Sequence, residues 1–117
     1  MPHLTIETSR RVRLPSDPKR FFTDLFVALE QLGHFKAADC KGRVHQASHY
    51  AVGEGADREF VHATFAILEG RPPEVRAAAA ELILSRLSSG FESVIPCDRS
   101  VEVREMERAP YRKVSGI

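Results

Sequence analysis

The residue with the clearest potential for chemistry is Pro2, which directly follows the initial methionine. Proline is a small second residue, so we expect an aminopeptidase to remove Met1 and leave Pro2 with a free secondary amine. The pyrrolidine ring fixes φ, which would hold this nitrogen at a defined position. An α-amino group titrates near neutrality, and burial beside cations lowers its pKa further, toward the range that suits a general base. Pro2 is therefore a candidate base, although a common second residue with no catalytic role gives the same dipeptide.

Length and composition suit one compact domain. The chain has 117 residues, of which 43% are hydrophobic and 28% charged, as in ordinary globular proteins. A formal net charge of +1 gives no reason to expect a nucleic-acid or membrane partner. The sequence shows neither a bilayer-spanning apolar run nor a signal peptide, and Cys40 and Cys97 lack disulfide or metal spacing. We therefore expect a cytoplasmic protein with reduced thiols.

The first half of the chain reads as strand, helix, strand. Residues 3–7 alternate between polar and apolar, which predicts a strand. A helix is predicted from Asp17 to Leu32, with Ser16 as its cap and Gly33 as its stop. Residues 43–52 predict a polar second strand, and residues 53–57 predict a turn.

The second half repeats this order. Residues 60–68 are almost continuously apolar, which predicts a central strand. A helix is predicted over residues 73–94, and alternation over residues 100–106 predicts the fourth strand. Residues 108–117 have no clear pattern and are interpreted as a C-terminal tail or interface arm.

Two βαβ units in one domain, residues 1–117, define the expected fold. Weak similarity between residues 2–58 and 59–107 supports a pseudo-repeat. Strands joined by a helix run parallel, whereas the short link between the second and third strands makes that pair antiparallel. The prediction is an α+β fold: a mixed four-stranded sheet with both helices on one face. The other face is then bare, which implies oligomerisation.

Four short stretches carry a resemblance to a known family: Pro2-His3, Gly42-Arg43-Val44-His45, Phe60-Val61-His62-Ala63-Thr64 and Gly70-Arg71. With the N-terminal proline and the doubled βαβ unit, they resemble the tautomerase superfamily, and most of all its 5-carboxymethyl-2-hydroxymuconate delta-isomerases. The resemblance spans roughly residues 2–107. The resemblance implies a homotrimer with no cofactor. It also implies that the Pro2 amine moves a proton from the 2-hydroxyl to a distant carbon of a conjugated enol carboxylate.

Arginines in this family would hold the carboxylates of the small-molecule substrate. The resemblance assigns Arg71 and Arg43 to substrate binding, because the guanidinium fork binds carboxylates bidentately. Lys41 stands where the family has an arginine, and it keeps the charge but loses the fork. Gln46 stands where the family has an aromatic residue, so one wall of the pocket differs.

Other interpretations of these residues are open. Arg71 alone is an ordinary loop arginine, and Lys41 and Arg43 also fit an interface. Four histidines suggest a metal site, but no Cys, Asp or Glu completes a ligand set at usual spacing, so packed histidines are the better interpretation. They are His3, His45, His49 and His62.

Two functional classes follow. The first is a cofactor-free isomerase of an unsaturated 2-hydroxy di- or tricarboxylate with Pro2 as its base. The second is a catalytically silent trimer, a binding or structural protein that keeps the same fold. The state of the N-terminus separates them, because a retained Met1 turns the Pro2 amine into an amide nitrogen without basicity.

Overall fold

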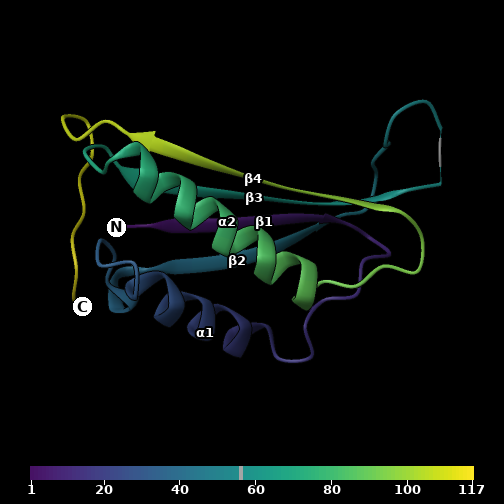
Figure 1. The fold of residues 1–117 in the computed structure, drawn as a ribbon, viewed down its shortest axis with the longest axis horizontal. Coiled ribbons are helices and arrows are strands. Elements are labelled where there is room, and N and C mark those ends of the chain that lie inside the picture. The colour runs from purple at the N-terminus through teal and green to yellow at the C-terminus, as the bar shows by residue number, and fades with distance from the viewer. Residues whose placement is uncertain (56) are drawn as a thin grey trace.

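A computed structural model describes residues 1–55 and 57–117. The element order is β1 (His3–Ser9), α1 (Pro18–Glu30), a short 3-10 turn η1 (Ala37–Asp39), β2 (Lys41–Ala47), β3 (Glu59–Leu68), α2 (Pro73–Gly90) and β4 (Cys97–Met106). The sheet order is β2-β1-β3-β4, so that the first strand of each βαβ unit lies in the middle. Figure 1 shows both helices in front of this sheet.

Strand directions follow from the connections. β1 and β2 are joined through α1 and pair in parallel, and β3 and β4 are joined through α2 and do the same. The central pair, β1 and β3, is antiparallel, with Thr5 opposite Thr64. The predicted α+β fold, with two βαβ units in a mixed sheet and both helices on one face, is confirmed.

The core lies between the sheet and the two helices. Side chains alternate along each strand, and one set packs under α1 and α2 while the other faces away from them. Leu4 and Ile6 of β1 and Phe65 of β3 are fully buried in this layer, against Leu25 of α1 and Ile83 of α2. Gly42 allows the closest approach, because a Cβ there would lie 2.3 Å from the Phe22 ring.

Several predicted boundaries differ from the observed ones for local reasons. β2 ends at Ala47 rather than at residue 52, because its partner β1 ends at Ser9, opposite Ala47. α1 is capped by Asp17, whose carboxylate accepts from the Arg20 amide at 3.1 Å, and not by Ser16.

The second unit shows similar differences. α2 ends at Gly90 rather than at residue 94, because the chain then crosses to Arg13, which exchanges backbone hydrogen bonds with Glu92. β4 begins at Cys97, opposite Glu59, three residues earlier than predicted. The turn predicted over residues 53–57 includes residue 56, which lies outside the described residues.

The sheet face opposite the helices is polar. Glu7 lies between His45 and His62 across three strands, and His62 Nδ1 is 2.7 Å from the Ser100 hydroxyl on β4.

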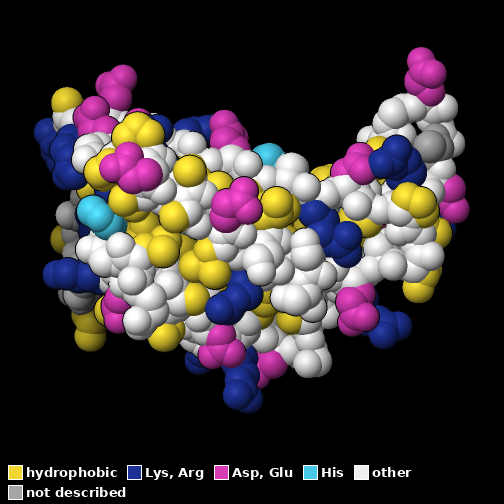
Figure 2. Space-filling view, viewed as in Figure 1, with side chains coloured by type: hydrophobic (Ala, Val, Ile, Leu, Met, Phe, Trp, Pro, Cys, Tyr) yellow, Lys and Arg dark blue, Asp and Glu magenta, His cyan; other side chains and the backbone are white. Residues whose placement is uncertain are grey.

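The helix-covered face carries basic and acidic side chains interspersed with apolar ones (Figure 2). No helix in the described part of the chain is long and apolar enough to cross a membrane.

Candidate active site

Pro2 lies at the end of the sheet where the N-terminus and the C-terminal tail meet (Figure 1). It immediately precedes β1, and its carbonyl accepts from the Lys41 amide at 3.0 Å, which ties it to the start of β2. Pro2 itself is buried, while Met1 is partly exposed. Two cavities meet at Met1, one of about 280 Å³ that Pro2 also lines and one of about 690 Å³. Removal of Met1 would place the Pro2 nitrogen beside both.

Arg71 lines the smaller cavity together with Pro2, as the sequence prediction requires of a substrate-binding residue. It follows Gly70, whose φ of 118° turns the chain away from β3. Its Nε and one Nη donate to the His34 carbonyl at 3.2 and 3.1 Å, and the other Nη donates to the Leu68 carbonyl at 3.0 Å. The guanidinium carbon lies 4.9 Å from the centroid of the Phe35 ring.

These contacts fix the guanidinium without neutralising it. Carbonyl groups and an aromatic face attract a cation but carry no formal charge. Because arginine has five N–H donors, the three bonds leave one donor on each terminal nitrogen within the described contacts. Arg71 can therefore offer positive charge and hydrogen bonds to an anion in the cavity.

The charges at this end of the sheet favour a neutral amine. Burial and the adjacent charge of Arg71 lower the pKa of the Met1 amine, and Lys113 acts in the same direction. Asp39, which lines both cavities, opposes them. The Met1 amine stands one residue ahead of the nitrogen that processing would expose, and Pro2 lines the same cavity as Arg71. We therefore expect the pKa of a free Pro2 amine to be lowered as well.

Lys41 and Arg43 lie apart from the Arg71 cavity. Both point from β2 to the face of the sheet that the helices do not cover, and Lys41 lines the larger cavity with Met1. Arg43 lines neither cavity: its Nη1 lies 3.3 Å from Nδ1 of His3. Burial and the charges of Arg43 and Lys41 lower the pKa of His3. Within one chain, therefore, Arg71 and Lys41 border the N-terminus and Arg43 does not.

The structure adds residues that the sequence pattern did not indicate. The turn between α1 and η1 brings His34 and Phe35 to the smaller cavity, and Gly33 allows this turn with a φ of 84°. Asp39, the last residue of η1, also lines this cavity. Gln46 does not wall the site. Its side-chain amide donates to the Val12 carbonyl at 2.9 Å and braces the loop after β1.

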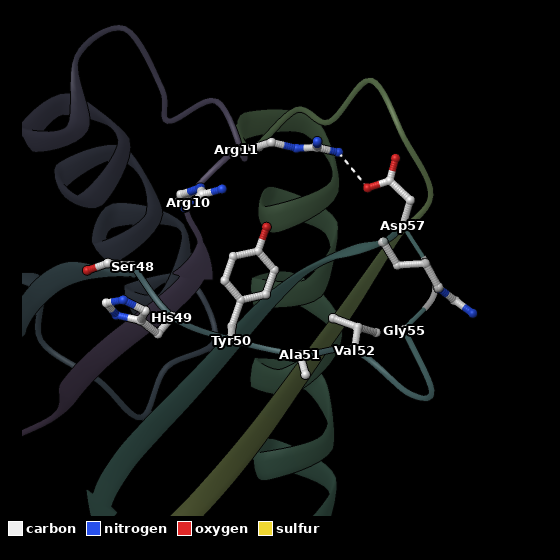
Figure 3. A pocket seen from close by; sticks show the side chains of 10 residues that line it. Arg10, Arg11, Ser48, His49, Tyr50, Ala51, Val52, Gly55 and Asp57 are labelled. Carbon is white, nitrogen blue, oxygen red and sulfur yellow. Dashed lines mark hydrogen bonds and ion pairs between the residues drawn. The ribbon is translucent and has the colours of Figure 1, made fainter.

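A third cavity, of about 480 Å³, lies at the opposite end of the sheet. Figure 3 shows Arg10, Arg11, His49 and Tyr50 around it, with Arg11 paired to Asp57 at 2.9 Å. Its lining includes neither Pro2 nor Arg71, so it is separate from the candidate active site.

A buried carboxylate beside this third cavity holds the β2–β3 connection. Glu59 is 1% exposed, and its oxygens accept from the Tyr50 hydroxyl at 2.5 Å and the Arg11 amide at 2.8 Å. Burial alone would raise the pKa of Glu59, but these hydrogen bonds hold it below its ordinary value. Because the folded pKa is the lower one, the stabilisation is present above the pKa of the unfolded chain and is lost as pH falls through the folded value.

We therefore expect Tyr50→Phe to destabilise the protein near neutral pH. The variant leaves a buried charge with one donor fewer, and its cost shrinks as Glu59 becomes protonated. The urea midpoints of wild type and variant at equal protein concentration should differ at pH 7 and converge as the pH falls through the lowered folded pKa of Glu59. Tyr111→Phe, in the tail, is the matched control. A difference that stays constant with pH would contradict this role for Tyr50.

The histidines do not form a metal site in the described residues, where no group of three His, Cys, Asp or Glu side chains is placed to hold an ion. His3 contacts Arg43, and His62 contacts Ser100.

Comparisons with known proteins agree with this fold. A crystal structure of a 5-carboxymethyl-2-hydroxymuconate isomerase from Deinococcus radiodurans R1 superposes with a TM-score of 0.72, over 98% of this chain and 90% of that chain, at 21% identity. A structure described as a fused 4-OT wild type symmetric trimer gives a TM-score of 0.68, over 93% and 91% of the two chains, at 18% identity. The fold is therefore the tautomerase fold.

Sequence comparison identifies the family. The profile of the 5-carboxymethyl-2-hydroxymuconate isomerases matches residues 2–116. The 5-carboxymethyl-2-hydroxymuconate Delta-isomerase of Escherichia coli is 29% identical over 96 residues, which are 81% of this chain and 76% of that protein. The chain belongs to the 5-carboxymethyl-2-hydroxymuconate isomerase family.

Proposed function

We propose that this protein is a cofactor-independent isomerase of an unsaturated 2-hydroxy di- or tricarboxylate, such as 5-carboxymethyl-2-hydroxymuconate. The observation that carries the proposal is the shared cavity of Pro2 and Arg71 at the N-terminal end of β1. In this cavity Pro2, whose nitrogen would become a free amine, lies with the Arg71 guanidinium, a cation held in place by its hydrogen bonds. Family membership supports an isomerase over a catalytically silent protein of the same fold.

The proposed reaction is a proton transfer with no net change in composition. The neutral Pro2 amine accepts the proton of the 2-hydroxyl, and electrons move through the conjugated system. The same nitrogen then returns a proton to a distant carbon. Positive charge beside the oxygens would stabilise the enolate as it develops, and we assign this role to Arg71, which lines the cavity with Pro2.

The test is turnover of a 2-hydroxymuconate-type enol by protein from which Met1 has been removed, followed by the change in ultraviolet absorbance. The decisive comparison is with protein that retains Met1. Absence of turnover by fully processed, folded protein on any di- or tricarboxylate enol would refute the proposal.

The polar face of the sheet supports assembly as a homotrimer with the three sheets around a central axis. A single α-over-β layer leaves that face uncovered, and the fused 4-OT of the same fold is described as a symmetric trimer. Glu7, His62 and Arg43 lie on this uncovered face, which three sheets around an axis would cover.

We expect sedimentation equilibrium to give the mass of three chains at micromolar concentration. Thr64→Arg places a large charge at the centre of the uncovered face and should dissociate the trimer. Ser85→Arg, on the exposed side of α2, is the matched control and should leave the mass unchanged. A stable wild-type monomer would contradict the assembly.

A further inference from the structure

The C-terminal tail, residues 108–117, is attached to the end of the sheet that carries the candidate active site. The Arg108 amide donates to the Glu69 carboxylate at 2.9 Å, and its Nε donates to the Glu69 carbonyl at 3.1 Å. A backbone bond from Tyr111 to the Arg108 carbonyl, at 3.1 Å, turns the chain at this point. The tail then passes the N-terminal end of β1 (Figure 1). These hydrogen bonds fix the start of the tail, after β4, beside the end of β3.

This course makes the tail one wall of the larger cavity at the N-terminus. Residues 111–116 line it on one side, and Met1, His3, Asp39 and Lys41 line it on the other. Nζ of Lys113 lies 3.0 Å from Sδ of Met1. Lys113 therefore contacts Met1, the residue whose removal would expose the Pro2 nitrogen.

The cations around Pro2 divide into two groups. Arg71 and Lys36 belong to the smaller cavity, whereas Lys113 and Lys41 belong to the larger one, and Met1 lines both. Arg112 also lines the larger cavity, but its Nη1 donates to the carbonyls of Ala109 and Tyr111 at 2.7 and 2.8 Å, which makes it a brace within the tail. Lys113 is the tail cation that contacts Met1 itself.

An elongated anion with a carboxylate at each end matches this division of charge. One carboxylate would bind Arg71, the reacting carbons would lie at the Pro2 nitrogen, and the second carboxylate would reach the larger cavity. A monocarboxylate would need only the first of these contacts. The tail would then decide which acids the enzyme accepts.

We infer that the C-terminal tail forms a wall of the active site and that Lys113 is a specificity-determining residue that binds the second carboxylate of a dicarboxylate substrate. This inference rests on the proposed function, and it assigns to that site a residue far along the chain from Pro2 and Arg71.

The test uses two unreactive probes on full-length protein without Met1. Adipate has a carboxylate at each end of a six-carbon chain, and hexanoate has one. We expect Lys113→Ala to weaken adipate binding about tenfold in calorimetric or NMR titrations, the scale of one charge-assisted hydrogen bond, and to leave hexanoate binding unchanged. Lys113→Arg should keep most of the adipate affinity. Lys19→Ala, an exposed lysine on α1, is the control for net charge.

Turnover gives a second measurement. The ratio of kcat/KM for a dicarboxylate enol to that for a monocarboxylate enol should fall about tenfold in Lys113→Ala, consistent with one lost contact. Equal losses on both substrates, or none on either, would overturn the role of Lys113.

The two proposals fail in different ways. If the enzyme activity is wrong, no protein will turn over the enols, yet adipate binding will still depend on Lys113. If the inference about the tail is wrong, the wild type will be active and adipate binding will be the same in Lys113→Ala.

Discussion

Protein that retains Met1 should isomerise an enol dicarboxylate at least 100-fold more slowly than protein that begins at Pro2, the lower end of what a general base contributes. With Met1 present, the Pro2 nitrogen is part of a peptide bond and has no basicity. With Met1 removed, the same atom becomes a secondary amine beside the cavity that Arg71 lines. The measurement is a rate comparison of the two forms, with the state of the N-terminus verified by intact mass.

The dependence of the rate on pH provides a sharper form of the same prediction. Burial, Arg71 and Lys113 lower the pKa of the Met1 amine, and we expect burial and Arg71 to lower the pKa of the processed Pro2 amine in the same way. A base is active when neutral, so the rate of processed protein should rise through one ionisation below the usual α-amino value of about 7.7–8.0 and then level off.

Two controls separate loss of the base from loss of structure. Both forms must be folded and have the same mass in solution. Pro2→Ala, once processed, exposes a primary amine and should keep part of the activity, whereas acetylation of the N-terminus should remove nearly all of it. Equal rates from the processed and the Met1-retaining protein would exclude Pro2 as the base.

Much of the fold follows from local patterns in the sequence. The continuous apolar run of β3 predicts a central strand, and its side chains on the helix side are fully buried. The polar β2 is an edge strand, with β1 as its only neighbour in the sheet order. Its end was the least accurate boundary, because it depends on where β1 stops and not on any property of residues 48–52.

The sequence predicts less of the candidate site than of the fold. The proximity of Pro2 and Arg71 depends on the antiparallel pairing of β1 and β3, which brings the start of one strand beside the end of the other. Asp39 and Lys113 carry no sequence signal, since a single charged residue in a loop has no periodicity and its position depends on the tertiary fold. Side chains alternate along β2, and Arg43 points to the face of the sheet away from the helices. It is therefore separated from the cavity that Pro2 and Arg71 line.

Removal of the Arg71 side chain should produce the second large effect. We expect Arg71→Ala to lower kcat/KM on a dicarboxylate enol by about 100-fold, the scale of one lost transition-state charge contact. The expectation rests on a guanidinium that His34 and Leu68 hold in place and that keeps donors for a ligand. Steady-state rates on processed protein measure the loss. Arg20→Ala, which removes an exposed arginine of α1 paired with Asp24, is the matched control.

The pH profile of Arg71→Ala distinguishes a contact with the reaction from a purely structural role. Arg71 is the leading charge that lowers the pKa of the Met1 amine, and we expect it to act in the same way on the processed Pro2 amine. Its loss should therefore raise the pKa of the Pro2 amine and move the rising limb of the profile to higher pH. Arg71→Lys keeps the charge without the fork, and should leave the limb near its wild-type position while the rate on dicarboxylates falls. If Arg71 only braced the turn at His34, both variants would lose activity in proportion to their loss of folded protein, and the limb would not move.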